Sequence, residues 1–175
     1  MKSSKYVIGE NVTIKSATIK DLENIKKFQK EIIDSMNNKE WFTPLTEYEF
    51  TYPLENNGKI NLLYYNKELI GLFVLTINPE ENIIKEYELD NKNIGILDSV
   101  MIKEKYRGSN LQRQGMKIIE EEASNLNIEH IVATIHPENI YSLNNFIKEN
   151  YKIIKKYNIH GGPRFIVVKN IVRRV

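Results

Sequence analysis

Apolar residues spaced three and four positions apart predict amphipathic helices in three parts of the chain. In chain order these residues are Leu22, Ile25, Phe28, Ile32, Ile33 and Met36; Met116, Ile119, Ala123 and Leu126; and Leu143, Phe146 and Ile147 within 139–150. Thr18 followed by Asp21 predicts a capped start for the first helix. Thr46 with Glu49 predicts another capped helix, from 47 to about 57.

Runs of β-branched and aromatic residues predict the strands. They are 12–16, 60–65, 69–77, 94–102, 128–135, 152–158 and 165–171. Asn66-Lys67-Glu68 joins two of them as a hairpin, and the run 69–77 is apolar on both faces, as in a central strand. A polar stretch fills 78–93. The order β-α-α-β-β-β-α-β-α-β-β indicates an α/β fold with helices on both faces of one sheet.

The composition narrows the class of protein. The 175 residues contain no repeat or long linker, which predicts one domain over 1–175. No cysteine is present, which excludes disulfides, thiolate metal sites and a cysteine nucleophile. The absence of a membrane-length apolar run, and of an apolar stretch within 1–6, leads us to expect a cytoplasmic protein that does not enter a membrane.

The charges and histidines point away from two kinds of site. Lys and Arg total 25 against 23 Asp and Glu, which argues against a nucleic-acid partner. His130, His136 and His160 lack metal-ligand spacing, so we expect no metal. His136 precedes Pro137, which favours an extended strand end and a structural role.

The segment 97–113 carries the candidate chemistry, because it runs from a strand through a turn into a helix. A Gly-, Ser- and Asn-containing turn that opens a helix presents unpaired N–H groups at the positive end of the helix dipole, where a diphosphate can bind. Gly108 allows a close approach of the backbone, and Asn110 tolerates a left-handed conformation. Nearby cations are Lys103, Lys105, Arg107 and Arg113. An ordinary capped turn with solvated lysines is the alternative.

The residues Tyr106-Arg107-Gly108-Ser109-Asn110-Leu111-Gln112 resemble the acetyl-CoA pyrophosphate loop of the GNAT superfamily of N-acetyltransferases, which has Arg or Gln, two residues, Gly, one residue, then Gly or Ala. Asn110 and Gln112 depart from the two later positions, and Gln112 could itself donate to the pyrophosphate. The run 133–142 with Phe146 and Asn150-Tyr151 resembles the family's strand and Asn-bearing helix, and 161–167 its closing hairpin.

The resemblance covers roughly 11–169 and implies a GNAT-like mixed central β-sheet of about six to seven strands flanked by about four helices. It implies that the strand ending at Ile102 splays from the one near Ile131, so that the pantetheine arm of acetyl-CoA enters between them. The implied cofactor-binding residues are Val100, Met101, Ile102, Arg107, Gly108, Ser109, Asn110, Leu111, Gln112, Arg113, Asn139, Ser142 and Phe146.

Catalysis requires a neutral amine, so a base or a water relay is expected. Asp98 and Ser99 lie on the strand from which the family often supplies the base, and strict alternation would let one of them face the acceptor. A structural carboxylate is the alternative for Asp98. Many family members carry an acidic Tyr where this chain has Phe146. Tyr141 is a candidate substitute if its hydroxyl reaches the sulfur, although a half-buried amphipathic Tyr at a helix start is the favoured interpretation.

The resulting prediction is transfer of an acetyl group from acetyl-CoA to a primary amine of a small molecule or peptide, by a monomer or homodimer. The alternative is a non-catalytic acyl-CoA-binding or sensing module, which the missing tyrosine permits. An aromatic group lies between the first two helices and is interpreted either as a wall of the acceptor pocket or as core. Its members are Trp41, Phe42, Tyr48, Phe50 and Tyr52.

Overall fold

The computed structural model describes residues 11–77, 79 and 93–171. Two predictions concern residues outside these ranges. They are the lack of an apolar stretch within 1–6 and nearly all of the polar stretch 78–93. The described helices are α1 (Leu22–Ser35), α2 (Glu47–Glu55), α4 (Leu111–Asn125) and α5 (Ile140–Lys148), with 3-10 turns η1 (Ile19–Asp21), η2 (Lys39–Trp41) and η3 (Glu104–Tyr106). The strands are β1 (Val12–Ser16), β2 (Lys59–Tyr65), β3 (Glu68–Ile77), β4 (Ile94–Ile102), β5 (His130–Ile135), β6 (Lys152–Ile159) and β7 (Gly162–Asn170).

The strands form one seven-stranded sheet in the order β1-β2-β3-β4-β5-β7-β6. Neighbouring strands are antiparallel except for β4 and β5, which run parallel. A parallel pair needs a crossover, and α4 supplies it. The predicted mixed sheet of six to seven strands with about four helices is therefore confirmed, with element ends that differ from the predictions by up to three residues.

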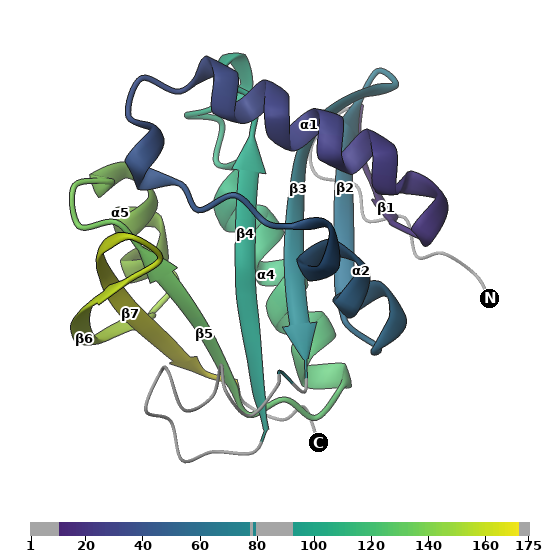
Figure 1. The fold of residues 1–175 in the computed structure, drawn as a ribbon. Helices are drawn as coiled ribbons and strands as arrows, with labels where there is room; N and C mark the ends of the chain where they lie inside the picture. Colours follow the sequence, from purple (N-terminus) through teal and green to yellow (C-terminus); the bar gives the residue numbers. More distant parts are fainter. Residues whose placement is uncertain (1–10, 78, 80–92, 172–175) are drawn as a thin grey trace.

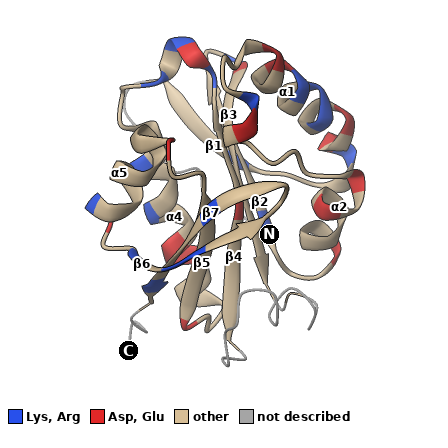
Figure 2. Ribbon diagram, turned by 60° about the vertical axis from the view of Figure 1, so that its left-hand side comes forward, with Lys and Arg blue, Asp and Glu red and all other residues tan. Residues whose placement is uncertain are grey.

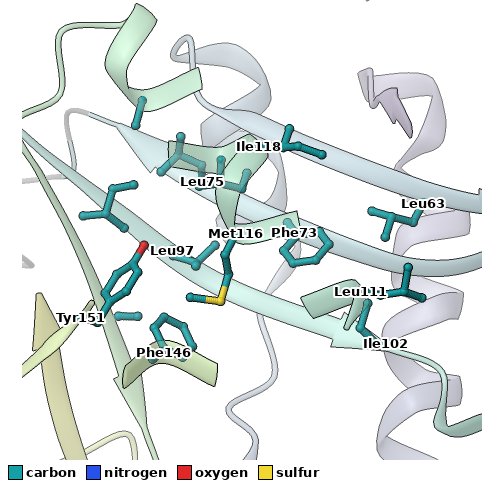
Figure 3. Packing of buried hydrophobic residues seen from close by; sticks show 14 of the residues in the cluster. Leu63, Phe73, Leu75, Leu97, Ile102, Leu111, Met116, Ile118, Phe146 and Tyr151 are labelled. Atoms are coloured by element: carbon teal, nitrogen blue, oxygen red, sulfur yellow. The ribbon is translucent and has the colours of Figure 1, made fainter. Parts of the chain in front are cut away.

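Two helices cover each face of the sheet (Figure 1). The α1/α2 face carries a core that includes Ile25, Phe28 and Phe50 from the helices and Leu72 and Met101 from the strands. The α4/α5 face carries the larger core, in which the residues labelled in Figure 3 include Phe73, Leu97, Met116, Phe146 and Tyr151. Both cores follow the predicted periodicity at most helical positions, but the expectation that Ile147 of α5 points inward is wrong, because its side chain is 45% exposed.

Gly115 fixes how closely α4 approaches the sheet. A Cβ atom at this position would lie 1.9 Å from the Phe73 ring of β3. Only glycine fits at such a contact, so the absence of a side chain lets the helix lie directly on the strand. The position of the first turn of α4 relative to β4 therefore depends on this packing.

The charged residues of α1 are of both signs (Figure 2). Lys26 illustrates the arrangement, because it bonds Glu23 in its own helix at 3.0 Å and Glu47 of α2 at 2.6 Å. These exposed pairs contribute little to stability individually. Among the described residues, no helix combines the length and the apolar character that crossing a membrane requires.

Candidate functional site

β4 and β5 pair over only three residue pairs, from Ile94–His130 to Ile96–Val132. Beyond Ile96, β4 continues to Ile102, whereas β5 continues to Ile135 as a partner of β7. The two strands separate toward their C-terminal ends, as Figure 1 shows. The splay that the resemblance implies is therefore present in this chain.

Val100, Met101 and Ile102 lie on the separated part of β4. The Met101 side chain is buried in the α1/α2 core and that of Ile102 in the α4/α5 core. Their main-chain groups on the β5 side have no strand partner among the described pairs. What this part of β4 offers to a ligand in the opening is thus its backbone edge.

Asp98 is the extra residue of a β-bulge. In the pairing of β3 with β4, Val74 lies opposite Ser99 and Leu75 opposite Leu97, so Asp98 has no opposite residue. Ser99 lies on the α1/α2 face with Val74, and Thr76 of that same face donates a hydrogen bond to Asp98. Both candidates therefore share one face, and the expectation that strict alternation places them on opposite faces is wrong.

The environment of Asp98 favours its protonated form. Burial raises the pKa of the Asp98 carboxyl to about 7, opposed by the hydrogen bond from Thr76 and assisted by the negative charge of Glu49 on α2. A carboxyl group with this pKa is about half ionised at neutral pH. Asp98 can therefore accept a proton near pH 7 and release it again, which a general base must do.

Ser99 is 5% exposed, and its hydroxyl has no hydrogen-bond partner among the described residues. A buried hydroxyl without a partner costs free energy unless a ligand or water satisfies it. It lies next to Asp98 on the same face of the sheet. The bulge thus presents a carboxyl and an unpaired hydroxyl together.

The turn after β4 has the backbone expected for an anion site. Gly108 and Asn110 have positive φ angles of 78° and 65°, and α4 begins at Leu111. The first helical hydrogen bond joins Gln114 N to Asn110 O at 3.1 Å, so the N–H groups of the preceding turn have no helical acceptor. Apart from Gly108 and its two chain neighbours, no atom of the described residues lies within 4 Å of a Cβ built on Gly108, so the turn is open above it.

Arg107 and Ser109 are held by main-chain oxygens in this turn. The Arg107 Nε donates to the carbonyl of Ile102 at 3.0 Å, which ties the turn to the end of β4. The Ser109 hydroxyl donates to the carbonyl of Tyr106. These bonds leave the outer nitrogens of the Arg107 guanidinium free of any described partner, beside the open helix start.

Two of the predicted cations are committed elsewhere. Glu68 of β3 accepts hydrogen bonds from Lys103 at 3.2 Å, Lys105 at 3.0 Å and Tyr106 at 2.8 Å. These bonds lower the pKa of the Glu68 carboxyl to about 2, and the bond from Tyr106 contributes most. Glu68 therefore remains ionised at neutral pH. The net positive charge beside the turn is therefore smaller than the sequence suggested. Sequence reasoning missed Glu68, because the residues it bonds lie more than 30 positions away.

Gln112 and Arg113 connect α4 to α5. Gln112 donates to the Ser142 hydroxyl at 3.1 Å and accepts from Asn145 at 2.9 Å. The Arg113 Nε bonds the buried carboxylate of Glu149 at 2.6 Å. Both amide heteroatoms of Gln112 are therefore occupied by α5, where the sequence had suggested a bond to pyrophosphate.

The remaining candidates lie on α5. The Asn139 side chain caps this helix by accepting from Ser142 N at 3.2 Å. Tyr141 is 75% exposed, so its ring is not the half-buried one that the amphipathic pattern suggested. Phe146 is 3% exposed and packs edge-on against Tyr151 with 4.9 Å between ring centroids, so its ring belongs to the core.

Some members of the aromatic group between α1 and α2 belong to the core, and others are exposed or lie beside β5. Phe50 is fully buried and Phe42 packs against the same core, whereas Tyr48 is 57% exposed. Trp41 stacks on the buried His136, which follows β5. No group of three or more His, Asp or Glu side chains suited to a metal occurs within the ranges that the structure describes.

Comparison with solved structures finds the same fold in several acetyltransferases. An N-acetyltransferase from Staphylococcus aureus Mu50 is 18% identical, with a TM-score of 0.73 over 93% of this chain and 100% of that one. YncA from Salmonella typhimurium, a putative acetyltransferase solved with its cofactor acetyl-CoA, is 12% identical with a TM-score of 0.73 over 94% and 96% of the two chains.

A chain of the NatC complex, solved with Gag peptide and CoA, is 18% identical with a TM-score of 0.73 over 93% of this chain and 99% of that one. At these identities the structural likeness establishes the fold alone. A comparison with curated proteins finds no match to this chain. The sequence model of the Acetyltransferase (GNAT) family, in contrast, matches residues 22–148, most of the chain and all of the site elements from β4 to α5, and the protein therefore belongs to the GNAT acetyltransferase family.

Proposed function

We propose that this chain is an N-acetyltransferase that moves an acetyl group from acetyl-CoA to a primary amine of a small molecule or peptide by direct attack. The observation that carries the proposal is the separation of β4 from β5 beside the open first turn of α4. The separated backbone edge and the open turn adjoin, because Arg107 bonds the last residue of β4. We also propose that 1–175 forms one cytoplasmic domain acting as a monomer or homodimer.

The first turn of α4 fits a diphosphate. Its N–H groups lack helical acceptors, the space above Gly108 is open, and Arg107 lies alongside. In the proposed complex the main chain of 108–113 and Arg107 hold the phosphates. The backbone of Val100, Met101 and Ile102 pairs with the pantetheine arm, and Asn139 and Ser142 border it from α5. Acetyl-CoA supplies an activated acyl group with a thiolate leaving group.

Asp98 acts as the general base in this proposal. In its ionised form it accepts a proton from the acceptor amine, so that the nitrogen lone pair is free to attack the thioester carbonyl. The N–C bond forms, the C–S bond breaks, and the electron pair leaves on sulfur, while the second proton of the attacking nitrogen passes to the thiolate or to water. A backbone N–H of the separated part of β4 donates to the carbonyl oxygen, where negative charge develops. Ser99 lies beside Asp98 and offers a further polar contact to the acceptor.

Neither of the two positions considered for a proton donor to the leaving thiolate supplies a buried acid, because Phe146 occupies a core position and Tyr141 is exposed. A thiol with a pKa of about 8.5 leaves tolerably as the anion, so we expect turnover without such an acid. A solvent-exposed Tyr141 can still reach a bound thiol from the start of α5. The presence of Phe146 at the position where many family members carry an acidic Tyr also favours the alternative function, a module that binds acyl-CoA without catalysis.

Release of free CoA thiol with a panel of primary amines tests the proposal. We expect amine-dependent release that Asp98→Asn lowers by about 100-fold, the range of general acid–base catalysis, while acetyl-CoA affinity measured by calorimetry is unchanged. Tight acetyl-CoA binding without release for any amine would establish the sensing module. Failure to bind acetyl-CoA would refute both functions.

A further inference from the structure

The segment between α1 and α2, residues 36–46, crosses the opening between β4 and β5 on the α1/α2 face (Figure 1). Phe42 and Leu45 pack on the core that contains Met101 of β4. Glu40 and Trp41 contact residues of β7 and the end of β5. The segment therefore spans the separated strands on the face that carries Asp98 and Ser99.

Arg164 of β7 fastens this segment at its far end. Its Nη2 donates to the carbonyl of Glu40 at 2.9 Å and to the Thr43 hydroxyl at 3.3 Å, and its Nη1 donates to the carbonyl of Pro163 at 2.9 Å. One guanidinium thus joins β7 to two residues on either side of Trp41. Lysine could not reproduce this arrangement, because its ammonium lacks the planar fork.

The burial of Arg164 is costly, which indicates that its position matters. The residue is 4% exposed, and no carboxylate pairs with it among the described ion pairs. Burial lowers the pKa of the guanidinium, yet an arginine remains charged in proteins. Buried charges are rarely kept without a paired counter-charge. Here three neutral oxygens hold the cation, two of them in the segment and the third on the preceding residue Pro163.

The hydrogen bonds of Arg164 to Glu40 and Thr43 hold the backbone on both sides of Trp41. Its ring stacks on His136 with 6.5 Å between centroids and 25° between planes. The indole N–H is buried and has no hydrogen-bond partner among the described residues. An indole N–H only donates, so it needs an acceptor atom from a ligand or water. The unpaired Ser99 hydroxyl lies on this same face of the sheet.

We propose that Arg164 is a positioning residue for the acceptor, and that it holds Trp41 so that the indole N–H donates to an oxygen next to the acceptor's amine. This inference rests on the proposed N-acetyltransferase function. The preferred acceptor then carries a carbonyl, carboxylate or hydroxyl oxygen close to the amine, as an amino acid or peptide does. A plain alkylamine leaves the N–H unpaired and binds more weakly.

The fluorescence of Trp41 tests the positioning directly, because the chain contains one tryptophan. In Arg164→Gln we expect the emission maximum to move to longer wavelength as the indole becomes solvated, and in Arg164→Lys to move less. Lys156→Gln, an exposed residue of β6 in the same hairpin, is the matched control with unchanged emission. Far-ultraviolet circular dichroism and acetyl-CoA affinity should stay the same in all three variants.

Steady-state kinetics test the role in acceptor binding. Arg164→Gln should raise the KM for an amino-acid amide about tenfold, equivalent to about 1.4 kcal/mol, with a smaller change in kcat and none in the KM for acetyl-CoA. Trp41→Phe keeps an aromatic ring on His136 but removes the N–H. It should raise the KM for the amide three- to tenfold, within the range of one hydrogen bond, and leave the KM for a plain alkylamine unchanged.

The outcomes separate this inference from the function beneath it. Unchanged emission in Arg164→Gln overturns the positioning role, and equal effects of Trp41→Phe on both amines overturn the contact with an oxygen. A kinetic effect on acetyl-CoA instead of the acceptor overturns the assignment to the acceptor side. If the wild-type chain releases no CoA with any amine, the proposed function and the acceptor role fail together, while the emission measurement still decides whether Arg164 places Trp41.

Discussion

Asp98→Asn should stabilise the folded chain at alkaline pH, because it removes a carboxyl group that is costly to ionise in place. Burial raises the pKa of Asp98 to about 7, against 3.8 for the ordinary group. Below pH 3.8 the carboxyl is protonated in both the folded and the unfolded chain. Between pH 3.8 and about 7 only the unfolded chain loses the proton, so the free energy of unfolding falls as the pH rises.

The difference between the two pKa values corresponds to about 4 kcal/mol as an upper limit, at about 1.4 kcal/mol per pH unit. Asparagine has nearly the same shape and can still accept from Thr76, but it does not ionise. Urea unfolding of both proteins at pH 4, 5, 6, 7 and 8 measures the effect. The stability of Asp98→Asn relative to wild type should increase up to about pH 7 and then level off.

Other titrating groups are common to the two proteins, so their contributions cancel in the difference. A difference that does not change with pH would show that Asp98 ionises normally in the folded state, and the general-base role would lose its physical basis. The same variant should be the less active enzyme. Greater stability with lower activity in one substitution is the signature expected of a strained functional group.

Three further predictions concern the site and its support. Arg107→Glu should weaken acetyl-CoA affinity at least about tenfold in calorimetry, with Lys152→Glu on β6 as a charge-matched control that leaves affinity unchanged, because a charge-assisted bond contributes about 1.5–3 kcal/mol. Gly115→Ala should lower the free energy of unfolding by about 1–3 kcal/mol in urea, since its methyl group overlaps the Phe73 ring, and equal stability would refute the close contact. Thr76→Val should move the acid limb of the kcat/KM profile to higher pH, because it removes a hydrogen bond that favours ionised Asp98. Glu49→Gln should move this limb to lower pH, because it removes a negative charge that opposes the ionisation of Asp98. Shifts in the same direction would contradict this account.

Local sequence signals predicted the fold and the backbone of the turn before α4 well. The capping box of Thr46 with Glu49 is present at the start of α2, and α4 begins at the residue after Asn110. Both features depend on residues a few positions apart, whose conformational preferences are intrinsic. Asn110 is left-handed, as its identity allowed. Such signals need no knowledge of the tertiary structure.

Side-chain partners across the sheet could not be predicted in the same way. Glu68 forms ion pairs with Lys103 and Lys105, and Glu149 forms one with Arg113, although nothing in the spacing of these residues along the chain predicts these pairs. Arg164 bonds a carbonyl more than 100 positions away. The bulge at Asp98 also escaped prediction, because an extra residue in a strand is set by pairing with β3 and leaves no pattern in one sequence.

The extra residue in β4 divides the strand into two halves with opposite phase. Leu97 and Ile102 both point into the α4/α5 core although five positions separate them, an interval that an uninterrupted strand cannot place on one side. Deleting a single residue here would restore regular alternation and turn Met101 and Ile102 each toward the wrong core. The position of the proposed base and the burial of the second half of the strand therefore both depend on one inserted residue.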